Sequence, residues 1–186
     1  MVGLTAWQAL FDDAELTAGQ RVLINGAGGG VGGYAVQLAK RAGAHVIATA
    51  SPRSRERVRS AGADEVIDHT ATDVTVAEPV DVLLNLARIA PDELVALVAL
   101  VRPGGVVVNT VPTIPTPGDD ERGVRAVGVF VRSDAEQLSR LAAMVDRGEL
   151  HVDVAERVPL AELPAVHAKA ATGALPGRVI VLAAAA

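Results

Sequence analysis

Short apolar runs alternate with helix-like stretches along the first half of the chain. The apolar runs are rich in β-branched residues, which suit a pleated sheet, so they predict strands. Between them, apolar side chains recur at the three- and four-residue spacing of a helix. We expect one helix over residues 31–42, ending at Gly43, and another from the N-cap Ser51-Pro52 to about residue 61. The predicted strands are residues 21–25, 45–49 and 65–68.

The second half of the chain repeats this alternation. Residues 80–86 are almost continuously apolar, which is typical of a parallel strand covered on both faces. Residues 110–123 contain three prolines and little apolar periodicity, so we expect a loop there. The other predicted elements are helices over 91–101, 133–147 and 160–172, the last interrupted by Pro164, a turn at 102–105, and strands over 106–109, 124–131, 152–158 and 178–182.

This order of elements predicts the fold class. Strands that alternate with helices form parallel sheets, and right-handed crossovers place the helices on both faces. We therefore expect an α/β protein with a doubly wound parallel sheet, a Rossmann fold. The whole chain, residues 1–186, is expected to form this single domain.

The segment between the first strand and the first helix is rich in glycine. It contains Gly28-x-Gly30-x-x-Gly33, and the overlapping Ala27-x-Gly29-x-x-Gly32 fits the same fingerprint with alanine first. At this place in a Rossmann fold, such a turn lets backbone N–H groups approach a diphosphate at the N-terminus of the helix. The alternative is a tight turn with a structural role only. The position between strand and helix favours nucleotide binding.

The residues after the second strand indicate which nucleotide is bound. Sites for NAD, and those of most methyltransferases, place a carboxylate here to bind ribose hydroxyls. This chain has Ser51 and Arg53 instead, and a guanidinium can hold a 2′-phosphate through two hydrogen bonds. We therefore predict NADPH as the cofactor rather than NADH or S-adenosylmethionine. Arg57 and Arg59, further along the helix, are expected to be solvated.

Composition excludes several other functions. The net charge is −5 and the aromatic content is 2%, so neither nucleic acid nor an anionic membrane is an expected partner. There is no cysteine, no signal peptide and no apolar run long enough to span a membrane, so we expect a cytoplasmic protein. No metal site is expected, because the histidines are dispersed without ligand spacing: His45, His69, His151 and His167.

These motifs together resemble the nucleotide-binding half of the medium-chain dehydrogenase/reductase superfamily, in its zinc-independent quinone oxidoreductase branch. The resemblance covers nearly the whole chain. It implies an NADPH-dependent oxidoreductase that transfers hydride from nicotinamide to a small carbonyl compound, alkene or quinone. The segments that carry it are Gly3-Leu4-Thr5-Ala6, Gly29-Gly30-Val31-Gly32, Gln37-Leu38-Ala39-Lys40, residues 61–68, Arg102-Pro103-Gly104-Gly105 and residues 177–182.

The resemblance also implies which residues contact the cofactor. The diphosphate would lie on the turn Ala27, Gly28, Gly29, Gly30, Val31 and Gly32. The adenosine phosphate would face Ser51, Arg53 and His69, and the adenosine or ribose would lie beside Asn85 and Leu86. The nicotinamide would be framed by Asn109, Val111, Phe130 and Val131.

The same resemblance implies how the chain relates to a complete enzyme. Residues 1–16 resemble the helix that leads in from a GroES-like catalytic domain, and the chain begins at that boundary, so we expect this domain to be absent. Hydride transfer needs a closed site, so the chain alone should bind cofactor and turn over little. A non-catalytic NADPH-binding module or sensor subunit is the alternative. We also expect a homodimer joined through strand 124–131, whose exposed edge would otherwise promote aggregation. Catalytic residues are not predicted.

Overall fold

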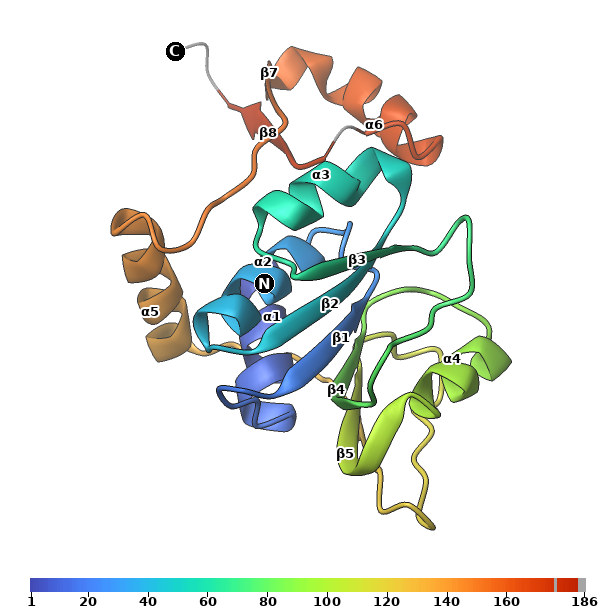
Figure 1. Cartoon of the computed structure of the whole chain (residues 1–186). Coiled ribbons are helices and arrows are strands. Elements are labelled where there is room, and N and C mark those ends of the chain that lie inside the picture. The colour runs from blue at the N-terminus through green and yellow to red at the C-terminus, as the bar shows by residue number, and fades with distance from the viewer. Residues whose placement is uncertain (176, 184–186) are drawn as a thin grey trace. The chain divides into compact units, whose positions relative to one another are not determined.

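The computed structural model describes residues 1–175 and 177–183, and these divide into two compact units, residues 1–150 and 151–186. The first unit contains a six-stranded parallel sheet in the order β3-β2-β1-β4-β5-β6 (Figure 1). Its strands are β1 (Arg21–Asn25), β2 (His45–Ala50), β3 (Glu65–Asp68), β4 (Val80–Asn85), β5 (Val101–Asn109) and β6 (Arg125–Gly128). This order reverses between β1 and β4, which is the doubly wound arrangement that the sequence predicts.

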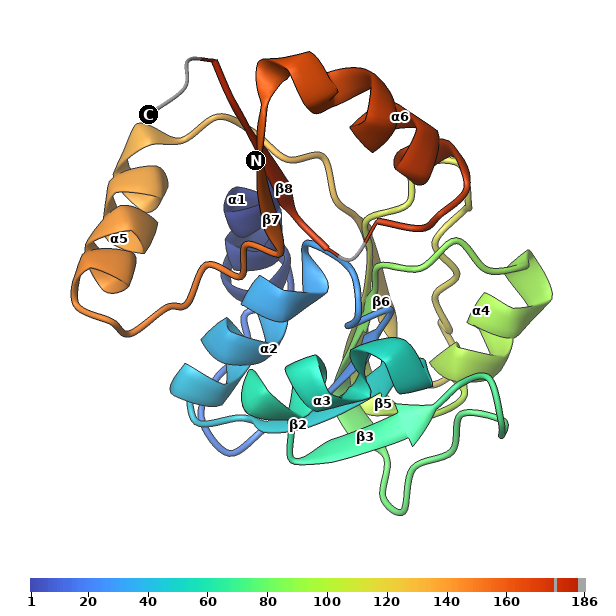
Figure 2. The same ribbon diagram turned by 90° about the horizontal axis from the view of Figure 1, so that it is seen from above.

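The helices of this unit cover both faces of the sheet (Figure 2). Neighbouring residues of a strand point to opposite faces, so Val22 and Ile24 of β1 pack in one core and Leu23 packs in the other. The helices are α1 (Val2–Trp7), the π-helix η1 (Gln8–Asp13), α2 (Gly32–Arg41), α3 (Pro52–Ser60), α4 (Pro91–Val98) and α5 (Ala135–Asp146). Residues of α4 pack in the core that contains Leu23, and residues of α1, η1, α2, α3 and α5 pack in the other. Helices on both faces are therefore confirmed.

The region around residue 101 differs from the prediction. The predicted helix over 91–101 ends at Val98, and β5 begins at Val101 rather than at residue 106. Val101 pairs with Val80 of β4, and the register shifts before the next pair, Val82 and Val106. The proline and glycines in between resemble a turn in the sequence, but pairing with β4 holds them as an irregular part of the strand.

Strand β6 is shorter than its apolar sequence suggests. It covers Arg125–Gly128, whereas the prediction was 124–131. Both backbone groups of Arg132 are bound by the buried side chain of Gln8: the Arg132 N–H donates to Gln8 Oε1 at 3.0 Å, and Gln8 Nε2 donates to the Arg132 carbonyl at 3.1 Å. Beyond β6, the N–H of Val129 still donates to the carbonyl of Asn109, the last residue of β5, at 2.8 Å, and the Gln8 side chain then binds the backbone of Arg132.

The second unit contains a two-stranded parallel sheet of β7 (Glu156–Pro159) and β8 (Val179–Leu182). The strand predicted at 178–182 therefore pairs with β7 rather than with the six-stranded sheet, and the strand predicted at 152–158 begins only at Glu156. Pro164 does not interrupt a helix. It lies in the first turn of α6 (Leu163–Ala171), after the 3₁₀ helix η2 (Leu160–Glu162), where a missing N–H costs nothing.

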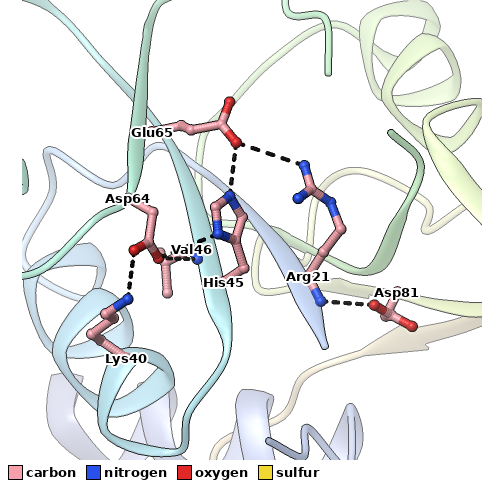
Figure 3. Close-up of polar contacts among 7 residues, drawn as sticks. All are labelled: Arg21, Lys40, His45, Val46, Asp64, Glu65 and Asp81. Carbon is pink, nitrogen blue, oxygen red and sulfur yellow. Dashed lines mark hydrogen bonds and ion pairs between the residues drawn. The ribbon is translucent and has the colours of Figure 1, made fainter. Parts of the chain in front are cut away.

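Charged side chains fix the amino ends of the strands in the first unit (Figure 3). Asp64, just before β3, accepts hydrogen bonds from Lys40 and from the N–H of Val46 in β2, the latter at 2.8 Å. Burial raises the pKa of the Asp64 carboxyl, but these two hydrogen bonds together with the charges of Lys40 and His45 outweigh it and leave the pKa below its ordinary value. Glu65 Oε1 lies 2.7 Å from His45 Nε2. These contacts hold the strands in register at the edge opposite the glycine turn.

Candidate functional site

The glycine turn connects β1 to α2 at the carboxyl edge of the sheet. Gly26 has a φ of +86°, which favours glycine, and starts the turn directly after β1. At Gly32 an added Cβ would stand 2.3 Å from the carbonyl oxygen of Ala27. Gly32 is thus the glycine that lets the helix pack closely against the strand end. An added Cβ at Gly33 would have no neighbour within 4 Å. The register Ala27-x-Gly29-x-x-Gly32 is therefore the one that the fold uses.

The outer side of the turn presents unpaired donors. In the described part of the chain, the backbone N–H groups of Gly30, Val31 and Gly32 have no acceptor. Gly30 is exposed, and a Cβ there would meet nothing within 4 Å. Packing within the protein therefore does not require glycine at position 30. Close approach of a ligand to the backbone at this position would require it. Free N–H groups at the start of α2, over an open surface, fit an anionic group such as a diphosphate.

Helix α3 packs one side against this turn. Ser54 is buried, and its Oγ would lie only 2.4 Å from a Cβ added at Gly28, too close for a side chain there. The Gly28 carbonyl accepts a hydrogen bond from Arg57 Nη2. The prediction that Arg57 is solvated was therefore wrong, and Ser54 was overlooked. Their spacing gives the signal that was missed, since residues 51, 54 and 57 are three apart and share one face of a helix.

The residues predicted to bind the adenosine phosphate lie at the start of α3 and the end of β3. Ser51 is the N-cap residue of α3, although its side chain makes no capping hydrogen bond, and Arg53 is exposed in the first turn. Arg55 pairs with Asp68 at 2.9 Å. Hydrogen bonds from the Thr70 side chain and N–H, together with Arg55, lower the pKa of the Asp68 carboxyl. Asp68 is thus favoured in its ionised form, which keeps it paired with the Arg55 guanidinium.

The remaining predicted site residues follow the other strand ends. His69 comes directly after β3 and is exposed, and Leu86 follows β4 and is half-buried. Val111 follows β5 and is buried, Phe130 lies two residues beyond β6 with 95% of its surface exposed, and Val131 is half-buried. Because all six strands are parallel, their carboxyl ends share one edge. The fold therefore places the whole predicted set along this edge, with the glycine turn at the switch point.

Two members of the predicted set differ from the rest. The side chains of Asn85 and Asn109 are 0% and 2% exposed, and their amide groups bind other protein groups. They end β4 and β5, side by side with Asn25 at the end of β1. These three amides form a buried row beneath the loops that follow the strands.

The described residues contain no group of three or more His, Cys, Asp or Glu side chains arranged to hold a metal ion. Among the same residues, no helix is both long enough and apolar enough to cross a lipid bilayer.

The chain is similar to several known oxidoreductases. A family model described as zinc-binding dehydrogenase matches residues 61–181. A trans-enoyl reductase of Aspergillus terreus is 36% identical over 121 residues, which are 63% of this chain and 34% of that protein. The human mitochondrial NAD(P)H oxidoreductase RTN4IP1 is 31% identical over 211 residues, which are 97% of this chain and 53% of the relative.

Among solved structures, the quinone oxidoreductase from Coxiella burnetii superposes with a TM-score of 0.84 at 29% identity. This match covers 97% of the present chain and 58% of the other. The chain therefore spans less than two thirds of the length of each of these three proteins.

Proposed function

The chain belongs to the zinc-binding dehydrogenase family, within the medium-chain dehydrogenases/reductases, and we propose from this and from the glycine turn that its first unit binds NADPH for an oxidoreductase. The observation that carries the proposal is the exposed Gly30, open above its backbone, whose N–H and the next two along the chain find no acceptor among the described residues. The turn from Ala27 to Gly32 would hold the diphosphate. Unpaired backbone donors and the positive end of α2 together favour such an anion.

Preference for NADPH over NADH rests on the residues after β2. No carboxylate stands there to accept the ribose hydroxyls, whereas the hydroxyl of Ser51 and the guanidinium of Arg53 lie at the start of α3. Both groups can donate to a 2′-phosphate. We assign His69, at the end of the neighbouring strand β3, to the same phosphate. Asp68 lies close by but is paired with Arg55, which reduces its repulsion of a phosphate.

The nicotinamide would lie at the other end of the edge, over β5 and β6. When bound, its reduced ring supplies the hydride. The chain would contribute apolar surface through Leu86, Phe130 and Val131, supported from below by the buried Val111, and this surface would orient the ring and shield it from water. The substrate class that we propose, a small enone, related carbonyl compound or quinone, follows the similarity to an enoyl reductase and a quinone oxidoreductase.

The family description includes zinc, which requires nitrogen, sulfur or carboxylate ligands in a tetrahedral set. The described residues do not provide such a set, and the sequence contains no cysteine. The residues present therefore do not fit a zinc ion, and no step proposed here uses one.

Calorimetric titration of the 186-residue chain with NADPH, NADH and S-adenosylmethionine tests the proposal. We expect NADPH to bind most tightly. At about 100 times its dissociation constant, NADPH should raise the melting temperature by roughly 5–10 °C, because selective binding to the native state then adds about 2.7 kcal/mol. Gly30→Val should abolish binding without changing the melting temperature of the ligand-free chain. A Cβ at this position has no protein neighbour within 4 Å, so the new side chain would fill only the space where the ligand is proposed to lie.

Arg53→Gln tests the 2′-phosphate assignment separately. It should weaken NADPH binding about tenfold and leave NADH unchanged, because only NADPH carries that phosphate. Arg59→Gln is the matched control, since Arg59 is exposed on the same helix and is not expected to contact the cofactor. If none of the three ligands bound, or if Gly30→Val kept full affinity for NADPH, the proposed function would be contradicted.

A further inference from the structure

A row of buried polar side chains crosses four adjacent strands beneath the site. The Thr49 hydroxyl of β2 donates to Asn25 Oδ1 of β1 at 2.8 Å, and Asn25 Nδ2 donates to Asn85 Oδ1 of β4 at 2.9 Å. Asn85 Nδ2 in turn donates to Asn109 Oδ1 of β5 at 3.0 Å. All four side chains are 5% exposed or less. We call these four residues the polar ladder.

Both ends of the polar ladder are backbone groups of fixed polarity. At one end the N–H of Gly26 donates to Thr49 Oγ1 at 2.8 Å. At the other end Asn109 Nδ2 donates to the carbonyl of Ile114 at 2.9 Å. A backbone N–H can only donate and a carbonyl can only accept, so each hydroxyl and amide between them has a single allowed orientation. Hydrogen bonds aligned in one direction strengthen one another in a buried site.

The polar ladder also binds three of the loops that line the proposed site, those after β1, β4 and β5. Gly26 begins the glycine turn, and Asn85 Nδ2 donates to the carbonyl of Ala87 in the loop after β4, at 3.1 Å. Asn109 Oδ1 accepts from the N–H of Val111 in the loop after β5, at 3.1 Å. The three loops are therefore tied to one rigid row of side chains, although they lie far apart in the sequence.

Burying four polar side chains costs free energy unless every group is paired, and an apolar strand end would avoid that cost. The row lies only at the carboxyl ends of the strands, directly under the proposed cofactor. Its amides are buried and occupied, so they cannot also bind a ligand. Because the polar ladder lies beneath the site and cannot touch a ligand, we expect it to act on the site through the loops that it binds.

We infer that Thr49, Asn25, Asn85 and Asn109 are positioning residues that couple the glycine turn to the nicotinamide-side loop, residues 110–114. The inference rests on the proposed function, since it assigns the two loops to the two ends of one cofactor. Asn85 and Asn109 were expected from the sequence to contact the cofactor directly. The inference gives them an indirect role instead, through the loops that they hold. A change at the β5 end should then alter binding at the turn after β1, two strand spacings or about 10 Å away.

The test uses 2′,5′-ADP, which carries the adenosine phosphates but no nicotinamide and should reach only α3 and the glycine turn. We expect Asn109→Leu to weaken 2′,5′-ADP binding about fivefold, by cutting the polar ladder at its far end. In the Thr49→Val background, where the row is already cut, Asn109→Leu should add little. Val107→Ala is the matched control: it opens the core beside Asn109, off the polar ladder, and should leave 2′,5′-ADP binding unchanged.

A second measurement needs no ligand. Thr49→Val keeps the side-chain shape and removes the hydroxyl, so amide hydrogen exchange at Val111 should speed up about tenfold, whereas Thr49→Ser should restore the wild-type rate. Equal 2′,5′-ADP affinity in Asn109→Leu and wild type, an equal loss in Val107→Ala, or unchanged exchange at Val111 in Thr49→Val would each overturn the inference. Failure of the wild-type chain to bind either nucleotide would instead overturn the proposed function, and the exchange measurement would still decide whether the row couples its two ends.

Discussion

Substituting alanine for Gly32 and for Gly33 separates two glycines that the sequence does not distinguish. At Gly32 the new Cβ would stand 2.3 Å from the Ala27 carbonyl oxygen, whereas real Cβ atoms essentially never come within 3.0 Å of such an atom. The helix α2 would therefore have to move by about 0.7 Å or more. The obstacle is backbone, so rotation of a side chain cannot relieve it.

Overpacking of this kind costs about 1–3 kcal/mol. In a unit of this size, 1 kcal/mol corresponds to roughly 2–4 °C in melting temperature, so Gly32→Ala should lower it by about 2–12 °C. At Gly33 the new methyl group enters open space inside a helix, where alanine is favoured over glycine by up to about 1 kcal/mol. Gly33→Ala should therefore raise the melting temperature by about 1–3 °C.

Thermal unfolding followed by circular dichroism measures both variants against the wild type. Urea unfolding should give the same order, with an unchanged dependence on denaturant concentration. If Gly33→Ala were the destabilised variant and Gly32→Ala were tolerated, the close approach of α2 to Ala27 would be incorrect, and the overlapping fingerprint beginning at Gly28 would be the functional one.

Three further predictions concern other parts of the first unit. Phe130→Ala should weaken NADPH binding about fivefold in a calorimetric titration, yet leave the melting temperature unchanged, because the side chain is 95% exposed and packs against little of the protein; an unchanged affinity would remove Phe130 from the site. Asp64→Ala should cost about 1 kcal/mol at pH 7, a small value because water screens the pair with Lys40. Since the folded-state pKa of Asp64 is lowered, this stability is present above the ordinary carboxyl pKa and is lost as the pH falls through the lowered value. Unfolding curves of variant and wild type should therefore converge in acid, and a constant difference at every pH would refute the charge-based explanation. Light scattering should give twice the mass of the chain if the exposed edge of β6 (Arg125–Gly128) joins two copies, and a monomeric mass would exclude that dimer.

Much of the fold could be predicted because its causes are local. The apolar runs that became β1, β2 and β4 are recognisable without any partner, since a strand buried on both faces needs such residues at every position. The alternation of strands and helices then implied the doubly wound sheet. The glycine turn was also predictable, because its place between β1 and α2 follows from the same pattern.

The errors arose where a distant part of the chain decides local structure. Residue 101 read as the end of a helix and residues 102–105 as a turn, but Val80 of β4 pairs with Val101 and extends the strand. Residues 129–131 read as strand, but the partner strand β5 ends at Asn109, and the side chain of Gln8 binds the backbone of Arg132 instead. The strand predicted at 178–182 was expected within a single domain with one doubly wound sheet, and it pairs with β7 in a separate two-stranded sheet. No local pattern contains these partners.

The sequence by itself therefore determined the class of fold, the position of the glycine turn and the edge of the sheet where the candidate residues gather. Those features depend on periodicity and on the chemistry of neighbouring residues. Only the tertiary structure decided that Gly32 rather than Gly33 is the packing glycine, that Arg57 reaches the Gly28 carbonyl, and that Thr49 and Asn109 end one buried row. Each of these depends on distances between segments that meet only when the sheet assembles.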